Sequence, residues 1–70
     1  MKTTELKINN NVVLLNPVGT FVVGQVGVIV GEWNAEFLEV EFVDVRGETI
    51  GFSAVPKADL LRLYFSPKAA

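Results

Sequence analysis

The chain contains no cysteine and no histidine among its 70 residues. Without cysteine it cannot form a disulfide, and without either residue type a structural zinc site loses its usual ligands. The same absences remove the commonest general base and the strongest nucleophile of enzyme active sites. A domain this small usually needs stabilisation beyond its own core, from disulfides, a bound metal or a partner subunit. The sequence therefore predicts one domain without metal, cofactor or catalytic residues, stabilised by packing or self-association.

Charge is sparse and unevenly distributed, with a formal net charge of −2. Between residues 32 and 48, six acidic residues are accompanied by Arg46 alone, whereas from residue 49 onward three basic residues accompany Asp59 alone. A nucleic-acid-binding domain needs a basic patch that faces the phosphates. Nucleic acid is therefore disfavoured as a partner.

Residues 8–31 carry no charge, which is long enough to raise the question of a transmembrane segment. Asparagines, a proline, a glutamine and four glycines interrupt this stretch, and its valine-rich runs favour strands over a helix. The first five residues lack the apolar segment of a secretory signal. We therefore expect a cytoplasmic protein without a membrane span.

Short β-prone segments separated by turn residues predict five strands. The expected strands are residues 12–15, 28–33, 37–43, 48–54 and 60–64. In the third, Leu38, Val40 and Phe42 alternate with glutamates, which is typical of a strand with one buried face. The fourth places Ile50, Phe52 and Ala54 together on one face. Residues 55–59 contain the proline and aspartate of a single 3₁₀ turn.

The long first loop, the tight central hairpins and the 3₁₀ turn before the last strand predict an all-β, five-stranded SH3-like small barrel. This barrel is expected to span residues 11–65, after a flexible N-terminal arm or edge strand at 1–10 and before a frayed C-terminus at 66–70. An OB-fold would need a helix between its third and fourth strands, for which residues 44–47 leave no room.

Residues 24–30, with the sequence Gly-Gln-Val-Gly-Val-Ile-Val, are similar to the Gly-x-x-Gly-x-Val hairpin entry of KOW-type and other SH3-like small barrels. Together with residues 12–15, 39–44, 47–49 and 59–63, they make the chain resemble a family of short bacterial proteins known as a domain of unknown function. The resemblance covers residues 11–64 and implies the fold and a partner encoded nearby, but no catalytic residue. Gly31 departs from the pattern and predicts an irregular second strand.

A second resemblance is to the type II dihydrofolate reductases, whose tetrameric SH3-like barrels bind their ligands in a central pore. Residues 25–33 are the comparable stretch. The Val-Gln-Ile-Tyr strand of that family should lie near residues 49–53, where this chain has Thr-Ile-Gly-Phe-Ser.

Glu39 and Glu41 lie about 7 Å apart on one strand face. Paired carboxylates at this spacing could act on a glycosidic bond or bind a cation weakly, but a solvated strand face explains them more simply.

Three aromatic residues are the candidate binding residues: Phe21 in the first loop, Trp33 at the end of the second strand and Phe37 at the start of the third. Exposed aromatic side chains there would form a hot-spot patch for a protein or peptide. The alternative is that they plug the ends of the barrel as part of the core. The sequence leaves both interpretations open.

Surplus apolar surface favours association with a second chain. Hydrophobic residues make up 50% of the chain, and the mean hydropathy is +0.40. The runs at residues 21–23 and 28–30 would pair with another strand if they lay at a sheet edge. We therefore expect a non-enzymatic binding module that acts through a protein partner or self-association. A KOW-like nucleic-acid-binding barrel is the alternative, and an oligomeric-pore enzyme is the third.

Overall fold

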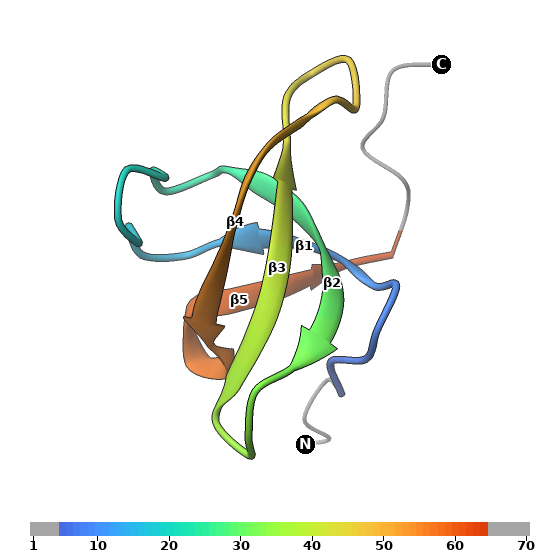
Figure 1. Cartoon of the computed structure of the whole chain (residues 1–70), viewed down its shortest axis with the longest axis vertical. Coiled ribbons are helices and arrows are strands. Elements are labelled where there is room, and N and C mark those ends of the chain that lie inside the picture. The colour runs from blue at the N-terminus through green and yellow to red at the C-terminus, as the bar shows by residue number, and fades with distance from the viewer. Residues whose placement is uncertain (1–4, 65–70) are drawn as a thin grey trace.

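The computed structural model describes residues 5–64, which form one five-stranded antiparallel sheet in the order β4-β3-β2-β1-β5 (Figure 1). The elements are β1 (Asn11–Leu14), β2 (Val26–Glu32), β3 (Phe37–Val43), β4 (Thr49–Pro56), the 3₁₀ turn η1 (Lys57–Asp59) and β5 (Leu60–Leu63). The sheet is strongly bent, so β1 and β5 run across behind β3 and β4 (Figure 1).

The predicted all-β fold, with five strands and a 3₁₀ turn before the last one, is confirmed. The strand ends shift by one or two residues, and β2 already begins at Val26. β4 and β5, the two borders of the sheet, do not pair with each other, so hydrogen bonds do not close the barrel. The predicted arm is described from Glu5 onward, and the predicted fraying at residues 66–70 lies outside the described residues.

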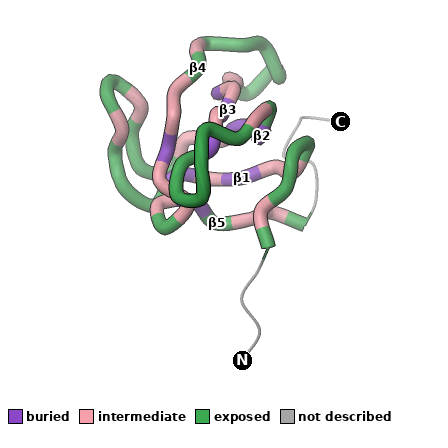
Figure 2. Tube along the Cα trace, turned by 60° about the horizontal axis from the view of Figure 1, so that its bottom comes forward, coloured by how far each residue is buried: buried purple, intermediate pink, exposed green. Residues whose placement is uncertain are grey.

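The core lies on the concave side of the bent sheet, where alternate side chains of the strands meet. Figure 2 marks the buried positions along the trace in purple. Its buried members are Val12, Leu14, Ile29, Leu38, Val40, Phe42, Val55 and Leu60. Leu6 from the N-terminal segment, and Val18 and Phe21 from the first loop (residues 15–25), pack against this cluster. The opposite, convex side of the sheet is called the outer face below.

The uncharged stretch at residues 8–31 forms β1, the first loop and β2. In the described part of the chain, no helix is long and apolar enough to cross a membrane. Residues 28–30 do not lie at a sheet edge, where they would be free to pair with another chain, because β2 is an interior strand that pairs with both β1 and β3. The register shifts between Ile29 and Gly31, which confirms the irregularity predicted from Gly31.

A row of three inward-facing residues crosses the middle of the sheet, in which Gly27 of β2 and Gly51 of β4 flank Phe42 of β3. A Cβ atom at Gly27 would lie 2.7 Å from a methyl of Val40 and 2.8 Å from the backbone oxygen of Glu41. At Gly31, by contrast, an added Cβ would make an ordinary contact of 3.6 Å with Glu39. Close approach of β2 to β3 therefore requires glycine at position 27.

The 3₁₀ turn η1 joins two loops. The N–H of Lys57 donates to the backbone oxygen of Glu36 at 2.8 Å, in the β2–β3 hairpin. The backbone oxygen of Asp59 accepts from Leu15 N–H at 2.8 Å, and its carboxylate accepts from the Asn16 amide at 2.8 Å, both in the first loop. Because η1 holds both loops, their positions relative to the sheet are coupled.

Replacing each of the two glycines of β2 with alanine distinguishes the effect of close packing against β3 from the effect of strand propensity on stability. We expect Gly27→Ala to lower the free energy of unfolding by about 2 kcal/mol or more, because the new methyl overlaps backbone that cannot move aside. Gly31→Ala should change it by less than about 0.5 kcal/mol. Urea unfolding followed by circular dichroism measures both, and equal losses in the two variants would contradict this account.

Candidate protein-binding surface

Phe21 is partly buried and packs against the core. Its ring stacks on that of Phe42, with centroids 4.3 Å apart and an interplanar angle of 29°. The same ring covers Gly51, whose added Cβ would lie 2.7 Å from the tip of Phe21. Of the two interpretations left open for Phe21, an exposed binding residue or a side chain that fills the end of the barrel, the second describes its position.

Trp33 lies directly after β2 and is 65% exposed. Its indole N–H donates to a carboxylate oxygen of Glu39 at 2.5 Å. Glu39 pairs with Gly31 across β2 and β3, on the outer face. Trp33 is therefore an exposed aromatic side chain whose orientation is fixed by a hydrogen bond to an ionisable partner.

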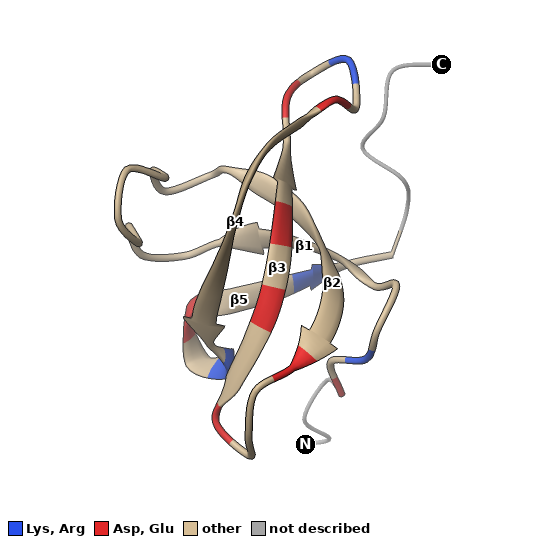
Figure 3. Cartoon of the chain, in the orientation of Figure 1, with Lys and Arg blue, Asp and Glu red and all other residues tan. Residues whose placement is uncertain are grey.

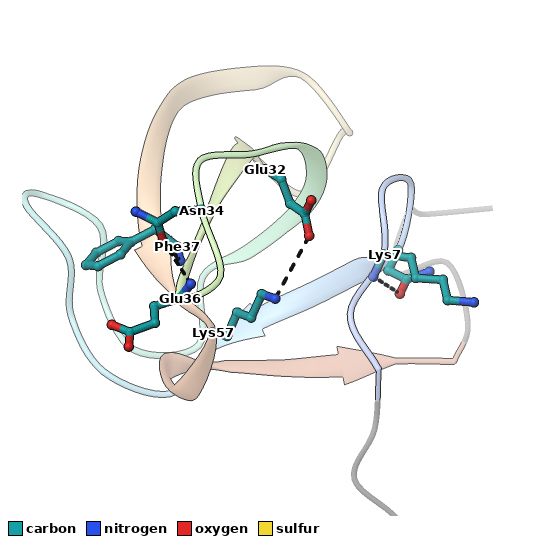
Figure 4. Close-up of polar contacts among 7 residues, drawn as sticks. Lys7, Glu32, Asn34, Glu36, Phe37 and Lys57 are labelled. Carbon is teal, nitrogen blue, oxygen red and sulfur yellow. Dashed lines mark hydrogen bonds and ion pairs between the residues drawn. The ribbon is translucent and has the colours of Figure 1, made fainter.

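Phe37 is the first residue of β3 and is 36% exposed. Because Leu38, Val40 and Phe42 point into the core, Phe37 shares the outer face with Glu39. In Figure 4 its ring points away from the ribbon. Phe37 and Phe42 are about 17 Å apart along the strand, so Phe21, stacked on Phe42, does not join this group. The structure thus places two of the three predicted residues at the same hairpin.

The loop between Trp33 and Phe37 is ordered by its own hydrogen bonds (Figure 4). The side-chain oxygen of Asn34 accepts from the N–H groups of Glu36 at 2.8 Å and Phe37 at 2.9 Å. The N–H of Trp33 donates to the backbone oxygen of Phe37 at 3.0 Å. Together with the bond from η1 to Glu36, these contacts hold both aromatic residues in place.

Sequence reasoning did not select Phe52, which is 56% exposed on β4. Alternation placed Ile50, Phe52 and Ala54 on one face, and the structure shows that this is the outer face. Gly51 faces inward, where the ring of Phe21 takes the space beside it. No local signal in the sequence identifies which face of β4 is covered, because the covering ring of Phe21 comes from a distant loop.

β3 carries two glutamates, seen as two red bands along its ribbon in Figure 3, and they face outward because they alternate with the buried residues of the strand. Glu39 accepts from Trp33, and Glu41 accepts a hydrogen bond from the Thr49 hydroxyl on β4. Each carboxylate thus interacts with a different neighbour. Within residues 5–64, no cluster of three potential metal ligands is present.

A hollow of about 600 Å³ opens at the end of the barrel beside β5 and η1. Its charged lining residues are Glu5, Glu32, Lys57 and Arg62. Lys57 lies 3.9 Å from Glu32 (Figure 4), and the guanidinium of Arg62 lies 4.5 Å from the centre of the Tyr64 ring. With two acids and two cations, this lining has no net charge that would select an ionic ligand.

Comparison with known protein families matches residues 10–62 to DUF4926, a domain of unknown function. The match covers all five strands except the last residue of β5. No significant match was found among curated proteins or among solved structures.

The plug formed by Phe21 can be tested by truncation. Phe21→Ala should lower the free energy of unfolding by about 2 kcal/mol or more, because it removes a ring packed against Phe42 and Gly51. The exposed neighbour provides the control, and Val22→Ala should cost less than about 0.5 kcal/mol. Thermal or urea unfolding of both variants measures the difference, and a Phe21→Ala variant as stable as Val22→Ala would refute the plug.

The fixed orientation of Trp33 can be followed by fluorescence, because it is the chain's single tryptophan. Glu39→Ala removes the acceptor of the indole N–H, so the emission should shift to longer wavelength and its anisotropy should fall. Glu39→Gln keeps an oxygen acceptor and should stay near wild type. Glu41→Ala, with the same loss of charge but a different partner, should leave the Trp33 signal unchanged. Identical spectra for Glu39→Ala and Glu41→Ala would show that the hydrogen bond does not hold the ring.

Proposed function

This chain belongs to the DUF4926 family of domains of unknown function, and we propose that it is a non-enzymatic module that binds another protein through its outer face, with Trp33 as the anchor. The observation that carries the proposal is the combination of high exposure and fixed orientation at Trp33. Tryptophan is among the residues that contribute most to protein interfaces when a partner buries it.

Preorganisation makes this surface suitable for binding. A flexible side chain loses conformational entropy when a partner immobilises it, and this loss subtracts from the affinity. At Trp33 much of the loss has already occurred, because Glu39 holds the indole and Asn34 orders the adjoining loop. Phe37 supplies further apolar area on the same face. The binding energy would therefore go into contact with the partner.

Charge describes the partner that would fit. Glu32, Glu36, Glu39 and Glu41 lie at or near the aromatic hairpin, with Lys57 as the neighbouring cation (Figure 3). A phosphate backbone would be repelled from this surface, which argues against the nucleic-acid alternative. A protein segment with an apolar side chain flanked by Lys or Arg would complement both the ring and the carboxylates.

The proposal is tested by capturing partners from cells that naturally express the protein, using cross-linking and quantitative mass spectrometry on tagged wild-type, Trp33→Ala and Tyr64→Ala chains. Tyr64 is the matched control, since it is an exposed aromatic residue that follows β5. For a partner so identified, Trp33→Ala should weaken the affinity about 30-fold or more, and Tyr64→Ala less than about threefold.

Two results would contradict the proposal. One is a partner that binds Trp33→Ala as tightly as wild type. The other is retardation of mixed nucleic acid by the wild-type chain in a low-salt gel, with the retardation lost as salt rises, which would favour the KOW-like alternative.

A further inference from the structure

β4 is a long border strand with a free side. It pairs with β3 along Thr49–Pro56, and within residues 5–64 no backbone hydrogen bond joins it to any other segment. Its register shift lies at the turn-proximal end, between the partners of Phe42 and Val43, so Gly51 to Pro56 pair regularly with β3. A regular stretch of peptide groups on the other side of β4 is therefore available to another strand.

Charge and interior proline, two of the usual protections of a border strand, are missing from β4, and its one register shift lies at the turn-proximal end. Proteins guard such strands with lysine, proline, inward charges or a covering segment. Among its eight residues β4 has no charge, and its one proline is the last residue. Ile50 and Phe52 stand on its outer face, 50% and 56% exposed. The opposite border, β5, has only four residues and contains Arg62.

We infer that β4 pairs antiparallel with β4 of a second copy of this chain, forming a two-fold symmetric dimer with one continuous sheet. An isologous contact requires a surface that complements itself. An antiparallel strand without charge meets this requirement, because every residue faces a neutral residue of its own strand. The axis passes at Phe52, near the middle of β4, so that Phe52 pairs with Phe52 of the second copy and the two side chains meet on the outer face.

Charge placement permits a second copy to pair at β4 and disfavours self-pairing at β5. On the outer face, the nearest carboxylates are Glu39 and Glu41, one strand inward on β3. Across the dimer, the two β3 strands would be three strand spacings apart, about 14 Å. This exceeds the screening length of about 8 Å at physiological salt, so the acidic strands of the two copies would repel only weakly. Self-pairing of β5 would instead bring two Arg62 guanidinium groups together.

This contact is separate from the proposed Trp33 surface. Trp33 follows β2 and reaches Glu39 on β3, so its ring lies over interior strands and does not lie at the free side of β4. The dimer would leave both Trp33 rings accessible. The inference therefore goes beyond the proposed function, and each can fail without the other.

Sedimentation velocity from about 1 to about 200 µM tests the inference, and the wild type is expected to shift from monomer to dimer as the concentration rises. In the Phe52→Lys variant, the introduced ammonium group lies opposite Glu41 within the monomer, so the fold should be preserved. Across the two-fold axis, however, it would lie opposite the same ammonium group of the second copy. Dimerisation should weaken at least about tenfold. Leu61→Lys is the control, because Leu61 is 51% exposed on β5 and undergoes the same change of charge. Its dimer should match wild type within about twofold.

Hydrogen exchange locates the contact. In wild type, amide protection within residues 51–55 should rise with protein concentration, and it should not rise in Phe52→Lys. Trp33→Ala should dimerise as wild type does. A monomeric wild type at the highest concentration would overturn the inference. So would a dimer lost in Leu61→Lys or Trp33→Ala but kept in Phe52→Lys, or β4 protection that appears only when a different protein is added.

Discussion

The stacking of Phe21 on Phe42, between Gly27 and Gly51, is the contact on which the rest of the domain depends. The two glycines lack the Cβ atoms that would separate these rings from the neighbouring strands. Phe21 thereby fixes the first loop to the sheet, and it also occupies the inner side of β4. Because that side is filled from elsewhere, Ile50 and Phe52 project outward. The apolar border strand is thus a consequence of how the core is packed.

A second coupling connects the core to the hairpin that carries Trp33. The turn η1 is held between Asn16 of the first loop and Glu36 of the hairpin, through Asp59 and Lys57. The first loop is itself anchored by Phe21. A chain of direct contacts therefore runs from the stacked rings to the aromatic surface. An exposed tryptophan in so small a domain keeps a fixed position because its loop is tied to parts of the chain that cannot move independently.

Local sequence patterns predicted much of this structure. The alternation of Leu38, Val40 and Phe42 located β3, and the proline and aspartate of residues 55–59 located the 3₁₀ turn η1. What failed depends on pairing between distant segments. The order of strands put residues 28–30 in the interior, and the filling of the space at Gly51 by Phe21 decided which face of β4 is buried. Neither is encoded within a single strand, so periodicity could indicate two faces of β4 but not their orientation.

On the outer face, the carboxylates of β3 lie between Trp33, which follows β2, and Phe52 of β4. Glu39 accepts a hydrogen bond from Trp33, and Glu41 accepts one from Thr49 of β4. A carboxylate is costly to bury without a compensating partner, so one flat apolar contact over the whole face is unfavourable. Two smaller contacts that leave these oxygens hydrated avoid that cost. Glu39, which orients Trp33, would therefore also separate the proposed Trp33 surface from the proposed contact along β4.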